Sequence, residues 1–148
     1  MTMNGPAPEG VEYLDHTADV GLRARGTTLG EAIEAAARGL FALMVDLEDV
    51  RSACAYGVSV SAATPEELLV ECLADLLAQK DVSGLVFSTF EVGVERAEGT
   101  YRLSGVARGE AIDRDRHRVG LEVKGISYLG LSAIEGRDGW VLECVLDV

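Results

Sequence analysis

Two acidic residues flank one of the two histidines of this chain, close to its N-terminus. Asp15, His16 and Asp19 belong to the run Asp-His-Thr-Ala-Asp, which ends shortly before a well-marked helix start. Side chains of these types can bind a cation, relay a proton, or stabilise a turn by hydrogen bonding to their own backbone. Short polar clusters are common in turns, so the local pattern by itself favours a turn.

A second charged cluster spans residues 109–118, where acidic and basic residues alternate around the second histidine. Glu110, Asp113 and His117 could face one shared site, and Arg116 with its neighbouring arginines could contact a partner. The simpler interpretation is a solvated connection with surface ion pairs, which usually contribute little to stability.

The third cluster is the C-terminal Asp147-Val148. A side-chain carboxylate beside the α-carboxylate is repelled unless a cation or a basic side chain lies nearby. An exposed terminus in water is again the simpler interpretation. Carboxylates from separate segments are, however, ligands that a hard cation such as Ca²⁺ or Mg²⁺ prefers. With no phosphate loop, nucleophile elbow or closed zinc-ligand set, the residue types favour cation binding over nucleophilic catalysis.

The charge of the chain is strongly one-sided. It has 13 basic and 25 acidic residues among 148, for a formal net charge of −12. Proteins draw most of their affinity for nucleic acid from Lys and Arg on phosphates, so little direct RNA or DNA binding is expected. A basic protein partner or a cation fits this charge better.

The cysteines and the hydropathy pattern indicate a cytoplasmic protein. The three cysteines are widely spaced and form no C-x-x-C pair, which predicts small buried residues in a reducing compartment. No apolar run approaches the ~20 residues of a membrane span. Residues 1–10 are expected to form a flexible leader without signal-peptide features, and residues 11–148 one domain.

Two helices and several strands are expected to position these clusters. Capping boxes at Thr28–Glu31 and Thr64–Glu67 open helices predicted at about 28–45 and 65–80. Apolar and polar residues alternate in segments that predict strands, at 11–24 with a turn at 15–19, 56–60, 86–94, 101–109, 118–123, 126–133 and 140–148. Because strands and helices do not alternate regularly, the fold class is α+β: one domain with a mixed or largely antiparallel sheet carrying two helices.

Several ordered motifs resemble the archease family, and the resemblance covers essentially all of the chain after Gly10. The motifs lie at residues 15–21, 26–32, 40–44 with Asp46, 109–113 with Arg116 and His117, 122–128, and 139–140 with Asp147 and Val148.

Archeases activate RtcB-type RNA ligases in tRNA splicing and RNA repair, by promoting guanylylation of the ligase and sustaining multiple turnover. The resemblance therefore implies a non-enzymatic activator whose partner is an RtcB-type RNA ligase. It also implies a bound divalent cation, Ca²⁺ foremost with Mg²⁺ or Mn²⁺ as alternatives, held by Asp19, Asp147 and Val148. Candidates for partner contact or for support of these ligands are His16, Glu110, Asp113, Arg116, His117 and Lys124.

The chain departs from the family pattern at two places, and two alternative functions stay open. Leu129 stands where the family carries a histidine, and residues 72–75 replace a Trp-Leu-Asn-Glu-like segment, which concerns partner contact more than the cation site. One alternative is a small metal-dependent hydrolase of phosphoesters, with Asp19 and Asp147 as ligands and His16 or His117 as general base. The other is a purely structural, chaperone-like binder.

Overall fold

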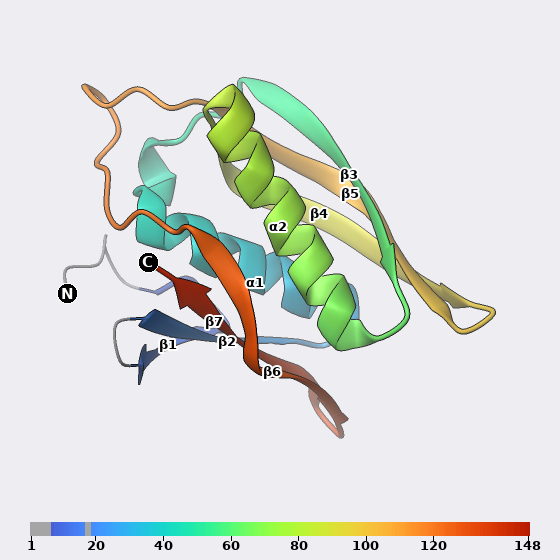
Figure 1. Ribbon diagram of the computed structural model, residues 1–148. Coiled ribbons are helices and arrows are strands. Elements are labelled where there is room, and N and C mark those ends of the chain that lie inside the picture. The colour runs from blue at the N-terminus through green and yellow to red at the C-terminus, as the bar shows by residue number, and fades with distance from the viewer. Residues whose placement is uncertain (1–6, 17–18) are drawn as a thin grey trace.

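Two antiparallel β-sheets lie on either side of one helix in the computed structural model, which describes residues 7–16 and 19–148 (Figure 1). One sheet has the strand order β1-β2-β7-β6 and the other has the order β3-β5-β4. The strands are β1 (Val11–His16), β2 (Asp19–Gly26), β3 (Cys54–Ala62), β4 (Leu85–Ala97), β5 (Thr100–Ala111), β6 (Gly125–Gly136) and β7 (Gly139–Asp147).

The central helix, α1 (Leu29–Met44), begins at the predicted capping box. The Glu31 N–H donates to Thr28 Oγ1 at 3.1 Å, and Glu31 Oε2 accepts from the Thr27 N–H at 3.2 Å. These bonds satisfy two of the backbone donors that a helix start leaves without partners. The predicted helix at 28–45 is confirmed.

The second helix, α2 (Pro65–Ser83), packs against β3 and β6 and extends three residues beyond its predicted end at 80. It ends at Gly84, whose φ of 69° is the left-handed conformation that glycine adopts readily at a helix C-terminus. The Gly84 N–H donates to the Lys80 carbonyl at 2.9 Å, which closes the last turn.

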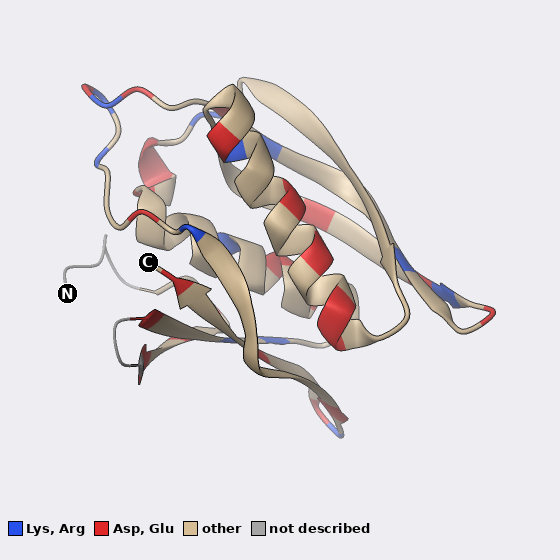
Figure 2. Ribbon diagram, viewed as in Figure 1, with Lys and Arg blue, Asp and Glu red and all other residues tan. Residues whose placement is uncertain are grey.

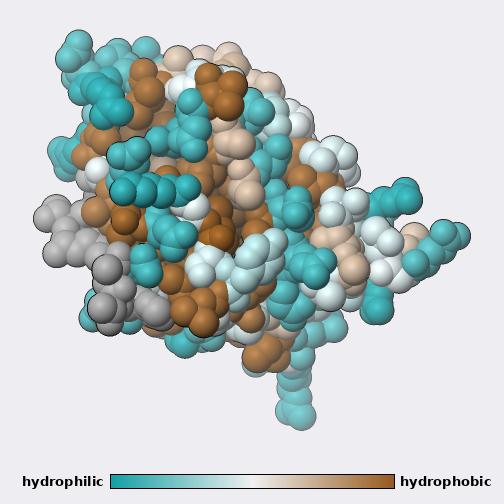
Figure 3. Space-filling view, in the orientation of Figure 1, coloured by the Kyte–Doolittle hydropathy of each residue, from teal (hydrophilic) through white to brown (hydrophobic). Residues whose placement is uncertain are grey.

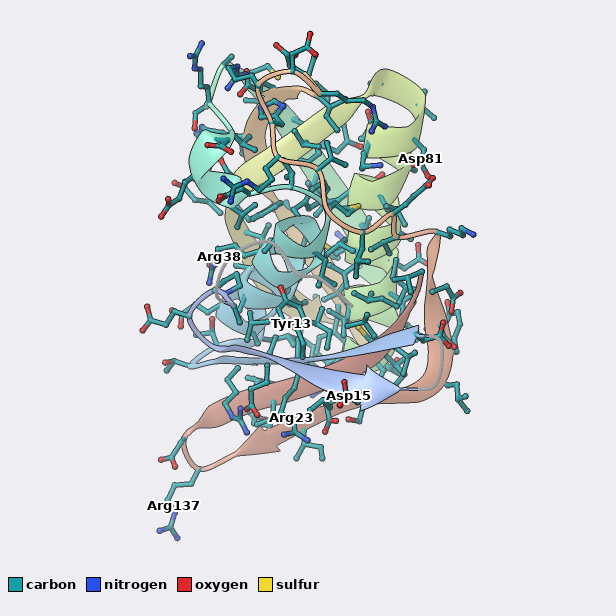
Figure 4. All side chains as sticks on the ribbon, turned by 90° about the vertical axis from the view of Figure 1, so that its left-hand side faces the viewer. Tyr13, Asp15, Arg23, Arg38, Asp81 and Arg137 are labelled. Atoms are coloured by element: carbon teal, nitrogen blue, oxygen red, sulfur yellow. The ribbon has the colours of Figure 1, made fainter. Side chains whose placement is uncertain are left out.

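Small residues let α1 lie close to the first sheet. A Cβ at Gly39 would come within 2.7 Å of Leu22 Cδ1 and 2.9 Å of Val11 Cγ1, so any larger residue would force these side chains to shift. Tyr13 reaches across the same contact and donates its hydroxyl to the Gly39 carbonyl at 2.8 Å. Figure 4 shows Tyr13 on the helix side of the sheet and Arg23 on the outer face. Burial raises the pKa of Tyr13.

The α+β class is confirmed, but the strands divide between two sheets where the sequence suggested one. All recorded strand pairings are antiparallel. The C-terminal strand β7 lies between β2 and β6. This order places residues from opposite ends of the sequence side by side (Figure 1).

The predicted strand at 118–123 is wrong. The backbone N–H groups of Gly120 and Leu121 donate to the carbonyls of Met44 and Leu43, at 2.8 Å each, and Val119 makes one isolated bridge to Val45. The last carbonyls of α1 need partners outside the helix, and this segment supplies them. This segment therefore caps the C-terminal end of α1 and belongs to neither sheet.

The cysteines only partly follow the expectation that all three are buried. Cys72 and Cys144 are buried as predicted, and burial raises the pKa of each thiol to about 12. Cys54 is exposed, because it opens the edge strand β3, and its Sγ donates to the Gly109 carbonyl at 3.3 Å. Within the described ranges, no helix has both the length and the apolar character needed to cross a membrane.

Candidate functional site

The pairing of β2 with β7 places Asp19 directly opposite Asp147. Side chains of directly opposed residues in antiparallel strands project from the same face, with their Cβ atoms about 4.5 to 5.5 Å apart. Asp19 is half-buried and Asp147 is exposed. The fold therefore brings the first and third charged clusters of the sequence together. Sequence spacing gave no sign of this, and only the family resemblance suggested it.

The two carboxylates belong to one row that crosses all four strands of this sheet. On one side Asp19 is paired with His16 of β1, and on the other Asp147 is paired with Gly125 of β6. A Cβ built at Gly125 would lie 3.6 Å from Asp147 Oδ2, so residue 125, as a glycine, places no side chain against this carboxylate. The side chain of His16 lies outside the described residues, as do Thr17 and Ala18.

Neither carboxylate has an ion-pair partner among residues 7–15 and 19–148. Lys124, a basic residue, directly precedes Gly125. Its backbone N–H donates to the Asp147 carbonyl at 2.7 Å, and its side chain is exposed. Figure 2 shows acidic segments at the ends of β7, β1 and β2, where these strands meet. Like charges directly opposed across two strands are destabilising, and a cation between them would relieve the repulsion.

The donor set fits a hard cation that completes its shell with backbone oxygens and water. No group of three or more His, Cys, Asp or Glu side chains that could hold a metal occurs in the described part of the chain. Ca²⁺ and Mg²⁺ both accept carboxylates, backbone carbonyls and waters together. Val148 has an apolar side chain that packs partly buried against the core, so its contribution to such a site would come from its backbone oxygens.

The second charged cluster is a packed network around His117. The ring of His117 is buried; its Nδ1 accepts from the Asp113 N–H at 2.8 Å, and its Nε2 lies 3.0 Å from Glu110 Oε2. Because Nδ1 accepts a backbone N–H, the ring proton lies on Nε2 and is donated to Glu110. Arg116 pairs with the other carboxylate oxygen of Glu110 and donates to the Asp49 carbonyl at 2.7 Å.

Charge-assisted hydrogen bonds stabilise the ionised form of Glu110. The Arg116 guanidinium, together with the Arg51 N–H that donates to Glu110 Oε2 at 2.7 Å, lowers the pKa of this carboxyl from 4.5 to about 2. The same ion pair raises the pKa of Arg116. The sequence pattern in this region favoured surface ion pairs, whereas only 13% of the Glu110 side chain and none of the His117 side chain is exposed.

This network anchors the start of the long connection between β5 and β6. The Arg116 and His117 N–H groups both donate to the Asp113 carbonyl, which folds residues 113–117 into a turn. The connection is then held by α1 at Gly120 and Leu121 and by β7 at Lys124. Lys124 is thereby fixed beside Asp147.

The predicted site residues fall into two groups. Asp19, Asp147, Lys124 and, by backbone register, His16 lie at one end of the first sheet. Glu110, Arg116 and His117 form the network, with Asp113 exposed at its rim. His117 is buried with both ring nitrogens engaged, so it can neither contact a partner nor abstract a proton unless the connection opens.

Sequence reasoning missed three contributors. Asp49 and Arg51 join the network through backbone groups, which any residue type possesses, so no sequence signal marks them. Gly125 places no side chain against the Asp147 carboxylate, and its place after Lys124 in a motif was the only available sign.

The lowered pKa of Glu110 predicts a stability loss in acid. Its folded-state pKa is below the ordinary 4.5, so its contribution to the free energy of unfolding is complete above about pH 4.5 and lost as the pH falls towards 2. Glu110→Gln should be less stable than the parent chain at pH 7, and the difference should shrink between pH 4.5 and 3. Urea unfolding at pH 7, 5 and 3 measures this.

Glu135→Gln is the matched control, because Glu135 is exposed and its carboxylate has no ion-pair partner among the described residues. It should follow the parent chain at every pH. A difference between Glu110→Gln and the parent that stays constant from pH 7 to 3 would contradict the role of the ionised carboxylate.

Comparison with known proteins identifies relatives along nearly the whole chain. A model of the archease protein family matches residues 11–148. The protein archease of Thermococcus gammatolerans is 41% identical over 138 residues, which are 93% of this chain and 97% of the relative. The protein archease of Pyrococcus furiosus is 38% identical over 138 residues, with the same coverage of both chains.

Solved structures agree with this relationship. The solution structure of protein 1598 from Methanobacterium thermoautotrophicum superposes with a TM-score of 0.84 at 30% identity, covering 94% of this chain and 99% of that one. An archease from Thermotoga maritima, described as a possible chaperone, has a TM-score of 0.57 at 16% identity over all of this chain and 99% of its own, which supports the fold alone. By the family match and the identity to these relatives, this chain belongs to the archease family.

Proposed function

We propose that this protein activates an RtcB-type RNA ligase by means of a divalent cation held between Asp19 and Asp147. The observation that carries the proposal is the facing pair of carboxylates without a described counter-charge, at one end of a sheet in a member of the archease family. The resemblance to activating archeases supplies the partner and the reaction, which is guanylylation of the ligase followed by multiple turnover in tRNA splicing and RNA repair.

The ligands of the cation are the carboxylates of Asp19 and Asp147 and the backbone oxygens of Val148. Ca²⁺ is the first candidate because it accepts many oxygen ligands in flexible geometry, which suits a site with only two side-chain ligands. Mg²⁺ and Mn²⁺ are the alternatives. When bound, the cation supplies positive charge that could stabilise a phosphate group of a bound nucleotide.

The charge of the chain supports a role beside an RNA-binding enzyme. At a formal net charge of −12, the chain does not compete for RNA phosphates, and it is attracted to the basic surface that an RNA ligase must present to its substrate. Asp113 and Lys124 are exposed and available to that partner, whereas Glu110, Arg116 and His117 hold the connection that presents Lys124. The chain would act where its partner acts, in the cytoplasm.

The hydrolase alternative finds no support. A general base needs an accessible atom that can take up a proton, and His117 has both ring nitrogens engaged inside a buried network. The description of the Thermotoga maritima archease as a possible chaperone is compatible with a protein that acts by binding another protein.

Cation binding is tested by thermal unfolding. A ligand bound only by the native state adds about 2.7 kcal/mol at one hundred times its Kd, which raises the Tm of a chain of this size by roughly 5 to 10 °C. Ca²⁺ should raise the Tm of the parent chain. Asp147→Asn should abolish the shift, and without cation its Tm should equal or exceed that of the parent because the facing repulsion is removed.

Asp138→Asn is the control for that measurement. Asp138 is an exposed carboxylate in the β6–β7 turn, and Figure 4 shows the neighbouring Arg137 at the tip of this hairpin, far from Asp15. It should keep the full shift. A Ca²⁺-induced rise in Tm that persists in Asp147→Asn would rule out the proposed site. The absence of any Tm shift in the parent chain with Ca²⁺, Mg²⁺ or Mn²⁺ would rule out cation binding.

Ligase activation is tested by the rate at which GMP becomes attached to the RtcB-type ligase of the same organism. The parent chain and Asp138→Asn should accelerate guanylylation with GTP and metal. Asp19→Asn should lower the acceleration at least tenfold, a loss of about 1.4 kcal/mol of stabilisation. No acceleration by the parent chain would refute the proposed function, and full activity of Asp19→Asn would refute the role of the carboxylate.

A further inference from the structure

The edge strand β6, near the carboxylate pair, carries a protrusion formed by residues 128–131. The register of β6 against β7 passes from Ser127 opposite Val145 to Ser132 opposite Glu143, so residues 128–131 face a single residue of β7. Gly130, at φ 74°, takes the left-handed conformation that glycine adopts without strain, and Ser127 Oγ accepts the Leu129 N–H at 3.0 Å. Bulges of this kind re-aim side chains and often lie beside functional sites.

The protrusion turns two large apolar side chains into solvent. Tyr128 is 62% exposed and Leu129 is 70% exposed, while Leu131 returns to pack against the core. Three other large apolar side chains are exposed in the described ranges, at positions 82, 119 and 134, and no two of these are consecutive in the sequence. On the face that carries β6 and α2, apolar residues are interleaved with hydrophilic ones (Figure 3). The fold thus leaves an aromatic and an aliphatic residue, consecutive in the sequence, largely exposed.

The protrusion lies close to the carboxylate pair. Ser127, where it begins, is opposite Val145, two residues from Asp147 along β7, which corresponds to about 7 Å at the rise of a strand. The charged residues on the segments that meet at this end are mainly acidic. They are Asp15, Asp19 and Asp147, with Lys124 as the basic exception.

We propose that Tyr128 and Leu129 are the apolar anchor by which this protein docks on its partner enzyme. This inference rests on the proposed function and names the docking surface of the same site. The occupant is an apolar socket on the ligase, rimmed by Lys and Arg side chains that complement the carboxylates around the anchor. Tyrosine in a desolvated pocket is among the residues that dominate binding energy at interfaces.

Charge decides between a partner enzyme and a second copy of this chain. A second copy docked at the same place would bring two acidic ends together, in a chain whose formal net charge is −12. Like charges brought together at an interface cost several kcal/mol, whereas a basic rim is attracted. The carboxylates beside the anchor therefore favour a basic partner.

The test compares two variants of β6. Tyr128→Ser/Leu129→Ser removes the anchor, and Ile134→Ser is the matched control, because Ile134 lies on the same strand, is 62% exposed and is opposite Val141, well away from Asp147. Titration calorimetry measures the Kd for the cognate ligase without GTP. The double variant should raise Kd about thirtyfold or more, and Ile134→Ser should stay within about twofold of the parent.

Three further measurements separate docking from other roles. The Tm of the double variant should stay close to that of the parent, with the same Ca²⁺-induced shift, because both side chains are mostly exposed. Acceleration of guanylylation should recover at saturating concentrations of the double variant, since docking governs the concentration needed. In sedimentation, the parent chain and the double variant should behave alike.

Each contrary result has a distinct meaning. A Kd within threefold of the parent, an equal loss in Ile134→Ser, or no binding of the parent chain to the ligase would overturn the docking surface. Self-association of the parent that the double variant lacks would overturn it in favour of a second copy. Anchor-dependent binding of the ligase without any acceleration would refute the proposed function and leave the docking surface standing.

Discussion

The antiparallel pairing of β2 with β7 is the constraint on which the candidate site depends. Its register sets Asp19 opposite Asp147, and no ion pair within residues 7–15 and 19–148 compensates the two negative charges. Because side chains alternate between the faces of a strand, a slip of one residue would separate the two carboxylates. The buried residues Val20 and Leu146, which follow and precede this pair in the same ladder, oppose such a slip.

The rest of the molecule keeps that end of the sheet in place. Helix α1 lies between the sheets, and its final carbonyls accept from Gly120 and Leu121 of the β5–β6 connection. The Glu110–Arg116–His117 network fixes the start of this connection, and the backbone bond from Lys124 to Asp147 fixes its end. The second charged cluster of the sequence thus has a structural role, because it fixes the start of a connection that ends beside the carboxylates.

Local features of the fold were predictable and non-local ones were not. The helix starts followed from Thr28 and Thr64, whose side chains accept from residues three positions later, and the class followed from the irregular order of strands. The division into two sheets depends on which strands pair, and alternation within a strand carries no information about its neighbour. The same limit hid the contact of Asp19 with the C-terminal strand, and it allowed residues 118–123 to resemble a strand while their N–H groups cap α1.

The most direct test of a single cation shared by Asp19 and Asp147 is paramagnetic broadening of backbone amide signals by substoichiometric Mn²⁺ in the ¹⁵N-labelled chain. We expect broadening to be strongest for Asp19, Val20, Asp147 and Val148, and Asp147→Asn to remove it. Broadening centred on the exposed Glu67 and Glu71 of α2, or unchanged around Asp19 in the variant, would contradict a cation shared by Asp19 and Asp147.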